Sequence, residues 1–314
     1  MALAQLTITP LDPIGAEVCG LAGDSFSPEV KVALNQAWLD HGVLLFRDVA
    51  SAEQHLALSR CFGELEIHPI KELRDADNPF FFPLGGPPML AQVFDEHDVR
   101  VGRIPWHRDT AFRPEICKGA MLRVLENRTN EGETLLGDTA AAYDALPADV
   151  KERIETLEYL AEVSHGSPHY TGPANWWKTA RLARDEEYPE GVEPPRDIRW
   201  PDNSALSPVI YPAVLRHPET GRTCLFLSPM NIKHFIGMSA AESAQLEAYL
   251  VRHMTDPRFV YRHRWSDNDA VLWDNRRIIH AANGYPATEH RLALRTTLAD
   301  KMQAGRPLEA EAAE

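Results

Sequence analysis

Apolar positions in the N-terminal part of the chain follow a helical period in two segments. Residues 27–42 (SPEVKVALNQAWLDHG) and 51–65 (SAEQHLALSRCFGEL) repeat apolar side chains at three- and four-residue intervals. Each segment opens with a serine, Ser27 or Ser51, and serine is a preferred helix N-cap. Both are therefore expected to be amphipathic helices, and Gly63 is expected to end the second. The apolar run GVLLFRD at 42–48 lies between them and predicts a buried strand.

Strand patterns dominate the chain beyond about residue 100, where short apolar or alternating runs are separated by Gly, Pro, Asn and Asp. The expected strands are 118–126, 208–217, 223–229, 259–265, 270–275, 277–282 and 291–298. Helices are expected at 139–160 and at 238–254, where Ser239 and Glu242 have capping-box spacing. We predict a mainly β fold with flanking helices (α+β) around a double-stranded β-helix, the jelly-roll or cupin-like core.

Residues 1–314 are interpreted as one domain, because a single elaborated β-barrel of this length is ordinary. An irregular, acidic and proline-rich insertion at about 167–208 contains Trp176 and Trp177. Long segments of this kind are typical of lids, partner-binding loops or mobile segments, and we expect a lid. The last residues, at about 304–314, are expected to be a short disordered tail.

Composition narrows the possible partners. Hydrophobic residues make up 44% of the chain and charged residues 25%, which is typical of a globular protein with a large core. The net charge of −14 repels phosphate backbones and anionic lipids, so neither nucleic acid nor a membrane is an expected partner. The four cysteines are widely spaced and no leader or membrane-length apolar run is present, which favours the cytoplasm. A homo-oligomer stays open.

The segment IPWHRDTAF contains a candidate for metal binding. His107 and Asp109 are two residues apart, so a strand would direct both side chains to one face. The pair alone is weak evidence, because 13 His and 46 acidic residues among 314 predict about two such pairs by chance. The other pair, His217 and Glu219, lies in a turn and is expected to be solvated. A simple His–Asp hydrogen bond is the alternative for the first pair.

A two-histidine, one-carboxylate metal site needs one more histidine and leaves three coordination positions open. His280 is the candidate, because an apolar strand carries it before a turn rich in Asn, Gly and Pro. The returning strand carries Arg291 and Arg295 on one face, about 13 Å apart at Cα. Either guanidinium could hold a carboxylate through two hydrogen bonds, and two outward-facing surface arginines are the alternative.

These motifs, in this order, resemble the taurine dioxygenase family of Fe(II)/2-oxoglutarate oxygenases. The resemblance runs through GVLLFRD, CFGEL, EIHPI, WHRDTAF, EGETLLGDT, HPETGR, VLWDNRRIIHAA and RLALRTT. It implies that His107, Asp109 and His280 bind Fe(II), and that Thr134 and Arg291 hold the distal carboxylate of 2-oxoglutarate. The family's spacing is kept, with 27 residues from first histidine to threonine and 11 from second histidine to arginine.

The resemblance also bears on the substrate. His68 matches a histidine that contacts the sulfonate in taurine-oxidising members, and Arg295 matches an arginine near the substrate. Lys71 and Arg103 stand where those members have Tyr and Asn, so taurine itself is not the expected substrate. These four side chains predict a small to medium anionic substrate, unless Lys71 and Arg103 are surface residues. The tryptophans of the insertion either close over an apolar or aromatic substrate or pack the insertion onto the barrel.

The implied reaction is hydroxylation with release of succinate and carbon dioxide, using dioxygen. Related halogenases replace the carboxylate ligand with a small residue, so Asp109 disfavours halogenation. Cleavage of C–S or C–O bonds and desaturation stay open. Two other interpretations are a non-catalytic jelly-roll sensor protein and a zinc hydrolase with the same ligands. The zinc hydrolase leaves Thr134 and Arg291 unexplained.

Overall fold

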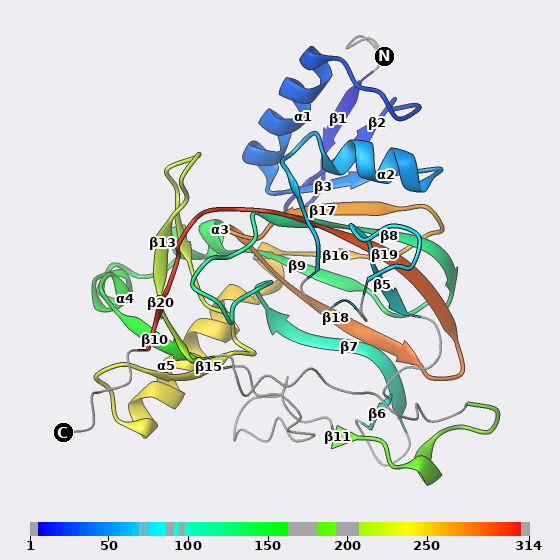
Figure 1. Cartoon of the computed structure of the whole chain (residues 1–314). Helices are drawn as coiled ribbons and strands as arrows, with labels where there is room; N and C mark the ends of the chain where they lie inside the picture. The colour runs from blue at the N-terminus through cyan, green and yellow to red at the C-terminus, as the bar shows by residue number, and fades with distance from the viewer. Residues whose placement is uncertain are drawn as a thin grey trace.

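The computed structural model describes residues 6–68, 71, 74–85, 91–93, 98–162, 181–192 and 207–308. Within these ranges the larger sheet has eight strands (Figure 1). Its strands, in hydrogen-bonded order, are β1 (Thr7–Pro10), β2 (Ala16–Cys19), β3 (Val43–Phe46), β17 (Ala270–Asp274), β8 (Gly119–Arg128), β19 (His290–Leu298) and β4 (Leu65–Glu66), with β5 (Phe82–Gly85) also paired to β19. All pairs are antiparallel except β2 with β3.

A second, antiparallel sheet lies beside the first and carries the candidate metal ligands. Its strands, in order, are β11 (Arg181–Leu182), β6 (Ala91–Val93), β7 (Val99–His107), β18 (Ile278–Pro286), β9 (Thr134–Asp138) and β16 (Val260–His263). The chain passes from the larger sheet to this one between β8 and β9 and again between β17 and β18, and it returns from β18 to β19. This alternation between two sheets confirms the predicted jelly-roll core.

A third layer covers the outer face of the second sheet (Figure 1). It contains a four-stranded sheet, β15 (Ile232–Phe235), β10 (Glu158–Ala161), β12 (Val209–Pro212) and β20 (Arg306–Pro307), and the hairpin β13 (Val214–Arg216) and β14 (Thr223–Leu225). The helices α3 (Thr139–Asp144), α4 (Ala148–Ile154) and α5 (Ala240–Met254) and the 3-10 turn at Pro257–Phe259 belong to this side. Helices α1 (Pro28–His41) and α2 (Ala52–Ser59) cover the larger sheet, and a 3-10 turn at Asp185–Glu187 follows β11.

Apolar side chains from both sheets meet between them. Leu122 and Val271 of the larger sheet belong to one buried cluster with Leu136 and Ile278 of the second. A separate cluster joins α1 and α2 to the outer face of the larger sheet and includes the fully buried Trp38. A third fills the space between the second sheet and the outer layer. The second sheet therefore lies between two apolar cores, which fixes the positions of its side chains.

Three of the predicted helices, α1, α2 and α5, are confirmed. Each begins after its predicted capping serine, Ser27, Ser51 or Ser239. Ser239 and Glu242 form the predicted reciprocal capping box. Helix α2 ends at Ser59, before the predicted end at Gly63, because shorter i to i+3 hydrogen bonds replace the helical pattern there.

The single helix predicted over 139–160 is wrong. Helices α3 and α4 are separate, with Pro147 between them, and β10 begins at Glu158. Proline has no N–H to donate and is accepted only near a helix start, which is where Pro147 lies, as the N-cap of α4. The last part of the predicted helix pairs instead with β12 and β15.

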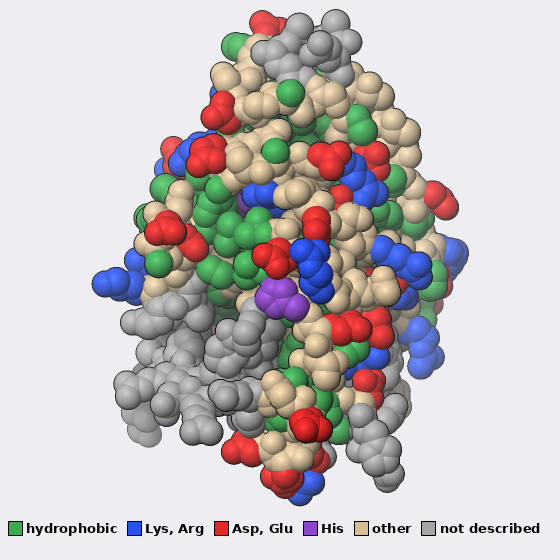
Figure 2. Space-filling model, turned by 90° about the vertical axis from the view of Figure 1, so that its right-hand side faces the viewer, with side chains coloured by type: hydrophobic (Ala, Val, Ile, Leu, Met, Phe, Trp, Pro, Cys, Tyr) green, Lys and Arg blue, Asp and Glu red, His purple; other side chains and the backbone are tan. Residues whose placement is uncertain are grey.

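The structure describes part of the predicted C-terminal tail and part of the predicted insertion. Strand β20 pairs with β12, so the boundary of the disordered tail at residue 304 is too early, and 309–314 lie outside the described residues. Of the insertion at 167–208, residues 181–192 and 207–208 are described, and β11 there pairs with β6. On the face shown in Figure 2, acidic and basic side chains are interspersed. No described helix is both long and apolar enough to cross a bilayer.

Candidate metal centre

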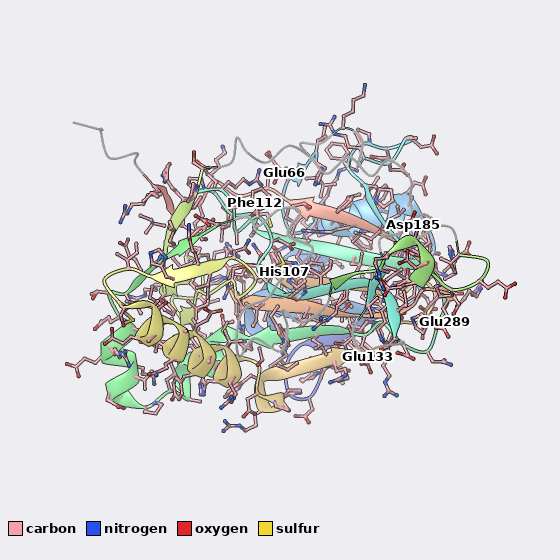
Figure 3. All side chains as sticks on the ribbon, turned by 90° about the horizontal axis from the view of Figure 1, so that it is seen from below. Glu66, His107, Phe112, Glu133, Asp185 and Glu289 are labelled. Carbon is pink, nitrogen blue, oxygen red and sulfur yellow. The ribbon has the colours of Figure 1, made fainter. Side chains whose placement is uncertain are left out.

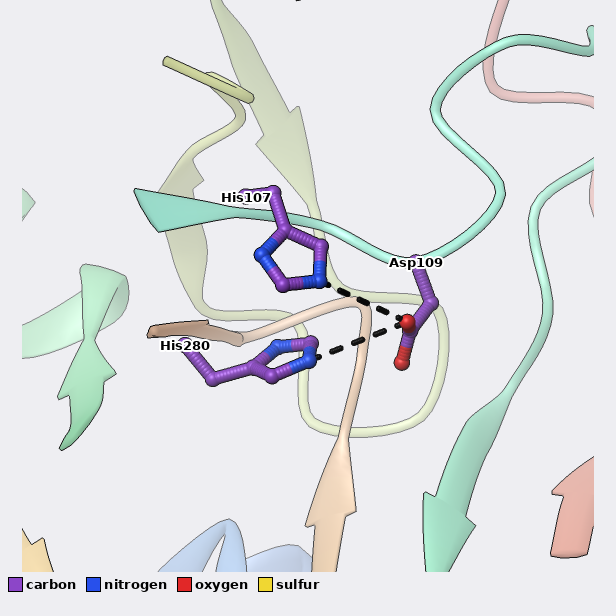
Figure 4. A group of neighbouring side chains, drawn as sticks. All are labelled: His107, Asp109 and His280. Atoms are coloured by element: carbon purple, nitrogen blue, oxygen red, sulfur yellow. Dashed lines mark ion pairs between the residues drawn. The ribbon is translucent and has the colours of Figure 1, made fainter. Parts of the chain in front are cut away.

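The second sheet brings the three predicted ligands together (Figure 4). His107 at the end of β7 lies directly opposite His280 of β18 in the strand register. Asp109 follows two residues after His107, with its Oδ1 atom 3.8 Å from His107 Nε2 and 3.7 Å from His280 Nε2. All three side chains are buried, and their possible ligand atoms lie within 4.8 Å of one another. The cluster is compact enough to share one ion.

Neighbouring groups orient the donor atoms. His107 Nδ1 lies 2.7 Å from the carbonyl oxygen of Pro105, so the ring hydrogen is on Nδ1 and the Nε2 lone pair is free. Trp273 Nε1 donates to Asp109 Oδ2 at 3.1 Å, and Arg295 Nη2 pairs with the same oxygen at 2.8 Å. Oδ1 is thereby left facing the two imidazoles. This is the orientation needed for a monodentate carboxylate ligand.

The electrostatic environment sets the protonation states that a metal needs. Burial lowers the pKa of both His107 and His280, so both rings are neutral at pH 7. Burial alone would raise the pKa of Asp109, but Arg295, and after it the two histidines, outweigh burial and lower that pKa to about 2. Two neutral imidazoles and one carboxylate are the donor set of non-haem Fe(II) sites, so the residues fit this metal.

Arg291 of the larger sheet is hydrogen-bonded to Gly132, two residues before Thr134 of the second sheet. Thr134 at the start of β9 pairs in register with Ala282 of β18, and its Oγ1 accepts a 3.0 Å hydrogen bond from Trp265 Nε1. Arg291 is buried at the start of β19 and donates from Nη1 to the carbonyl of Gly132. No acidic residue in the described ranges pairs with Arg291. Burial lowers the pKa of its guanidinium.

Gly132 is required for this arrangement. Its φ of 79° is in the left-handed region, which favours glycine. A Cβ added there would lie 2.8 Å from Nη1 of Arg291 and 3.1 Å from the ring of Tyr285. The guanidinium, in turn, lies 5.0 Å from the centre of that ring. Close approach of the backbone therefore holds Arg291 against Gly132, two residues before Thr134.

A cavity of about 120 Å³ reaches the cluster at Asp109. Its lining residues are Glu66, His68, Asp109, Thr110, Phe112, Arg113, Arg295 and Thr297. Figure 3 shows His107 near the middle of the molecule, with Phe112 and Glu66 toward the same side. The structure therefore brings two predicted substrate-binding residues, His68 and Arg295, to one cavity beside the metal ligands.

Lys71 and Arg103 are not among the described residues that line this cavity. Lys71 is exposed. Arg103 is half-buried on β7, opposite Asn283 in the register, and burial lowers its pKa. Trp176 and Trp177 lie outside the described residues.

The expectation that His217 is a solvated turn residue is wrong. His217 is buried, and its Nε2 lies 2.8 Å from Asp274 Oδ2. Arg276 binds Asp274 and also Glu219, the latter at 2.7 Å. The turn between β13 and β14 is present, but it packs against the turn between β17 and β18. The local sequence pattern did not indicate this packing, because the paired residues are far apart along the chain.

Sequence reasoning also missed Trp273, which hydrogen-bonds the carboxylate of Asp109, and Asn275, which binds its main chain. Both belong to the segment AVLWDN, whose apolar pattern indicated only a strand. A tryptophan and an asparagine close to a candidate ligand in sequence are the signal that would have drawn attention to them.

Comparisons with known proteins agree with this geometry. The family described as taurine catabolism dioxygenase TauD, TfdA family matches residues 7–297. The (S)-phenoxypropionate/alpha-ketoglutarate-dioxygenase of Sphingobium herbicidovorans is 32% identical, over 93% of this chain and 94% of the relative. The alpha-ketoglutarate-dependent 2,4-dichlorophenoxyacetate dioxygenase of Cupriavidus pinatubonensis is 31% identical, over 96% and 99%. The solved structure of AAD-2 in complex with Mn(II) and N-oxalylglycine has a TM-score of 0.70 and 27% identity, over 95% and 99%.

Proposed function

The chain belongs to the taurine catabolism dioxygenase TauD, TfdA family, and from this premise we propose that its substrate is an aryloxyalkanoic acid or a closely related organic anion. It is an α-ketoglutarate (2-oxoglutarate)-dependent dioxygenase, an oxidoreductase that uses Fe(II), 2-oxoglutarate and dioxygen. The sensor and zinc hydrolase interpretations are set aside, because the two relatives described above, which match 93% and 96% of this chain, are dioxygenases.

His107, Asp109 and His280 are the proposed iron ligands. Their support is the burial of the three side chains, the convergence of both Nε2 atoms on Oδ1, and the neutral state of both rings. Bound Fe(II) supplies the dioxygen chemistry, which couples decarboxylation of 2-oxoglutarate to succinate with hydroxylation of the substrate.

Arg291 and Thr134 are the proposed partners of the distal carboxylate of 2-oxoglutarate. A buried guanidinium without an acidic partner in the described ranges is costly, and a carboxylate that binds it through two hydrogen bonds compensates that cost. The Oγ1 atom of Thr134 already accepts a hydrogen bond from Trp265, which leaves its O–H free to donate to the same carboxylate.

The cavity beside Asp109 is the main support for the proposed substrate. His68 and Arg295 supply groups that bind an anion, and Nε of Arg295 is a buried donor without a partner among the described residues. Phe112 gives the same cavity an aromatic wall. A carboxylate joined to an aromatic ring matches both features. Lys71 and Arg103, outside this lining, and Trp176 and Trp177 stay proposed contacts that substitution has to test.

Hydroxylation of such a substrate leads to C–O cleavage by ordinary chemistry. The new hydroxyl group on the carbon between the ether oxygen and the carboxylate forms a hemiacetal or hemiketal. When its hydroxyl proton is lost, the C=O bond forms, the ether C–O bond breaks, and a phenol and a 2-oxo acid are released. We propose this course over desaturation.

The test is a screen for succinate and phenol release with iron, ascorbate and 2-oxoglutarate. The panel contains aryloxyacids, sulfonates, sulfate esters, amino acids and larger natural-product acids. We expect the largest oxygen-dependent succinate release, with equal phenol release, from an aryloxyacid. Coupled turnover only with sulfonates or sulfate esters would refute the proposed substrate class, and product formation without oxygen would refute the dioxygenase mechanism.

A cytoplasmic location is also proposed. All four cysteines are free thiols, which is typical of a reducing compartment. Cell fractionation that places the native protein in an oxidising compartment would contradict this.

A further inference from the structure

Asn275 is fully buried and holds the main chain of a proposed iron ligand. Its Oδ1 atom accepts a 2.8 Å hydrogen bond from the backbone N–H of Asp109. Its Nδ2 atom donates to the carbonyl oxygens of Asp109 at 3.0 Å and Cys117 at 3.2 Å. One side-chain amide therefore satisfies both backbone groups of Asp109 without touching its carboxylate.

Asp109 needs such support because no strand holds it. Strand β7 ends at His107, and the register with β18 ends there too. The next residue along the chain, Thr110, has a φ of 57°, a conformation that β-branched residues rarely adopt. Its Oγ1 atom accepts a 2.8 Å hydrogen bond from Cys117 N–H. Side chains, rather than a strand ladder, thus determine where the carboxylate of Asp109 projects.

Arg108 lies between the two ligands in the sequence, so its side chain extends from the opposite side of the backbone. It is buried, and its Nη1 atom donates to the carbonyl oxygen of Asn275 at 2.7 Å. Its other side-chain hydrogen bonds go to Thr139 Oγ1 at 2.9 Å and to the carbonyls of Leu225 at 2.7 Å and Leu227 at 3.2 Å. Arg108 and Asp109 together make three hydrogen bonds to Asn275, which fixes the two segments relative to each other.

Asn275 also connects Asp109 to the second histidine. It lies in the turn from β17 to β18, five residues before His280 on the same chain segment. Trp273, two residues before it, donates to Asp109 Oδ2. The end of β17 and the turn after it therefore contact Asp109 at its side chain and at its main chain, and this segment leads directly into the strand that carries His280.

We propose that Asn275 is a positioning residue for iron binding. It fixes the backbone of Asp109 so that Oδ1 faces the Nε2 atoms of His107 and His280, and Arg108 fixes Asn275 in turn. Partners of metal ligands commonly change metal affinity by tenfold to a hundredfold when they are replaced. This inference rests on the ligand set proposed above.

The test compares Asn275→Asp with a matched control, Asn35→Asp. Aspartate keeps the shape of asparagine but has no N–H to donate. Asn35 also donates from Nδ2 to two main-chain carbonyls, those of Lys31 at 2.8 Å and Cys61 at 2.7 Å, in a part of the chain remote from the ligands. Fe(II) affinity is measured without oxygen by competition with a chelator, and the unfolding midpoint of the metal-free protein is measured in parallel.

We expect Asn275→Asp to bind Fe(II) about tenfold to a hundredfold more weakly than wild type, while Asn35→Asp binds it as wild type. Asn275→Ser, which adds no charge, should show the same loss and serves if the aspartate variant does not fold. Wild-type affinity in a folded Asn275 variant would overturn the inference.

The double variant Asp109→Ala with Asn275→Asp separates positioning from general stability. If Asn275 acts through the carboxylate, its replacement causes no further loss of affinity once Asp109 is alanine. An equal further loss in that background would overturn the inference. Wild-type affinity in Asp109→Ala alone would instead overturn the proposed ligand set, which is a distinguishable result.

Discussion

Replacing Arg291 by methionine should abolish tight 2-oxoglutarate binding without weakening the fold. The guanidinium is buried, its hydrogen bond goes to the neutral carbonyl of Gly132, and no acidic residue in the described ranges pairs with it. The ligand-free protein therefore contains a buried charge that lacks compensation. Methionine has a similar length and no charge, so Arg291→Met should leave the ligand-free protein as stable as wild type, or more stable.

The size of the effect on binding follows from the two hydrogen bonds that a guanidinium makes to a carboxylate. Each hydrogen bond to a charged group contributes about 1.5–3 kcal/mol. Loss of about 3 kcal/mol weakens the affinity for 2-oxoglutarate on the order of 100-fold. At a ligand concentration of about 100 times the wild-type Kd, the ligand stabilises wild type by about 2.7 kcal/mol and the variant by only about 0.4 kcal/mol.

The assay is thermal unfolding with and without 2-oxoglutarate, combined with anaerobic titration of Fe(II) alone. Arg128→Met is the matched control, because Arg128 is an exposed arginine on β8, the strand adjacent to β19. We expect iron affinity to be unchanged in both variants and the 2-oxoglutarate response to be lost only in Arg291→Met. A destabilised variant that still responds to 2-oxoglutarate, or one that loses iron and 2-oxoglutarate equally, would refute the assignment.

Three further outcomes are expected. His107→Ala and His280→Ala should each lose the weak visible band that Fe(II) and 2-oxoglutarate produce without oxygen, and a retained band would remove that residue from the ligand set. Burial lowers the pKa of His55 to about 3, below its unfolded value of about 6.5, so the stability it contributes is lost as pH falls from about 6.5 toward 3. Between pH 7 and pH 5, the free energy of unfolding of His55→Gln, measured with urea, should therefore fall by about 2 kcal/mol less than that of wild type. An identical fall would contradict this. The pKa of Asp274 is held well below its usual range, although burial alone would raise it, by His217 and Arg276, so its contribution is present above about pH 4 and lost in acid. Asp274→Asn should lower the free energy of unfolding by about 3–5 kcal/mol at pH 7 and by less at pH 3. An equal decrease at both pH values would show that the charge of Asp274 is not the cause.

The resemblance to a family, based on short motifs, predicted the residues of the candidate site, and the structure brings His107, Asp109 and His280 into one cluster. Local alternation predicted His107 and Asp109 on one strand face, but β7 ends at His107, and hydrogen bonds from Asn275 hold the backbone of Asp109 instead. The register of β18 with β7 brings His280 opposite His107. Sequence could name His280 because the motif around it is local. It could not supply the distance between His280 and the other two residues, since that distance depends on how two strands pair across the sheet.

Residues that act through long-range partners were beyond sequence reasoning. His217 looked like a turn residue because its neighbours are turn formers, and its burial depends on Asp274, 57 positions away. Asn275 looked like the end of a strand, and its role depends on Asp109, 166 positions away. Likewise, the alanine-rich pattern after residue 139 indicated one helix, although pairing with β12 and β15 makes its last part a strand.

The sequence by itself determined the features that depend on near neighbours: the capping serines, the alternation of the strands, and the order of the residues proposed to bind iron and 2-oxoglutarate. Only the tertiary structure decided which buried charges are paired, as for Asp274, and which have no acidic partner in the described ranges, as for Arg291. The physical reason is that caps and alternation are set by bonding over a few residues. The stability of a buried charge, in contrast, is set by whatever distant segment the fold packs against it.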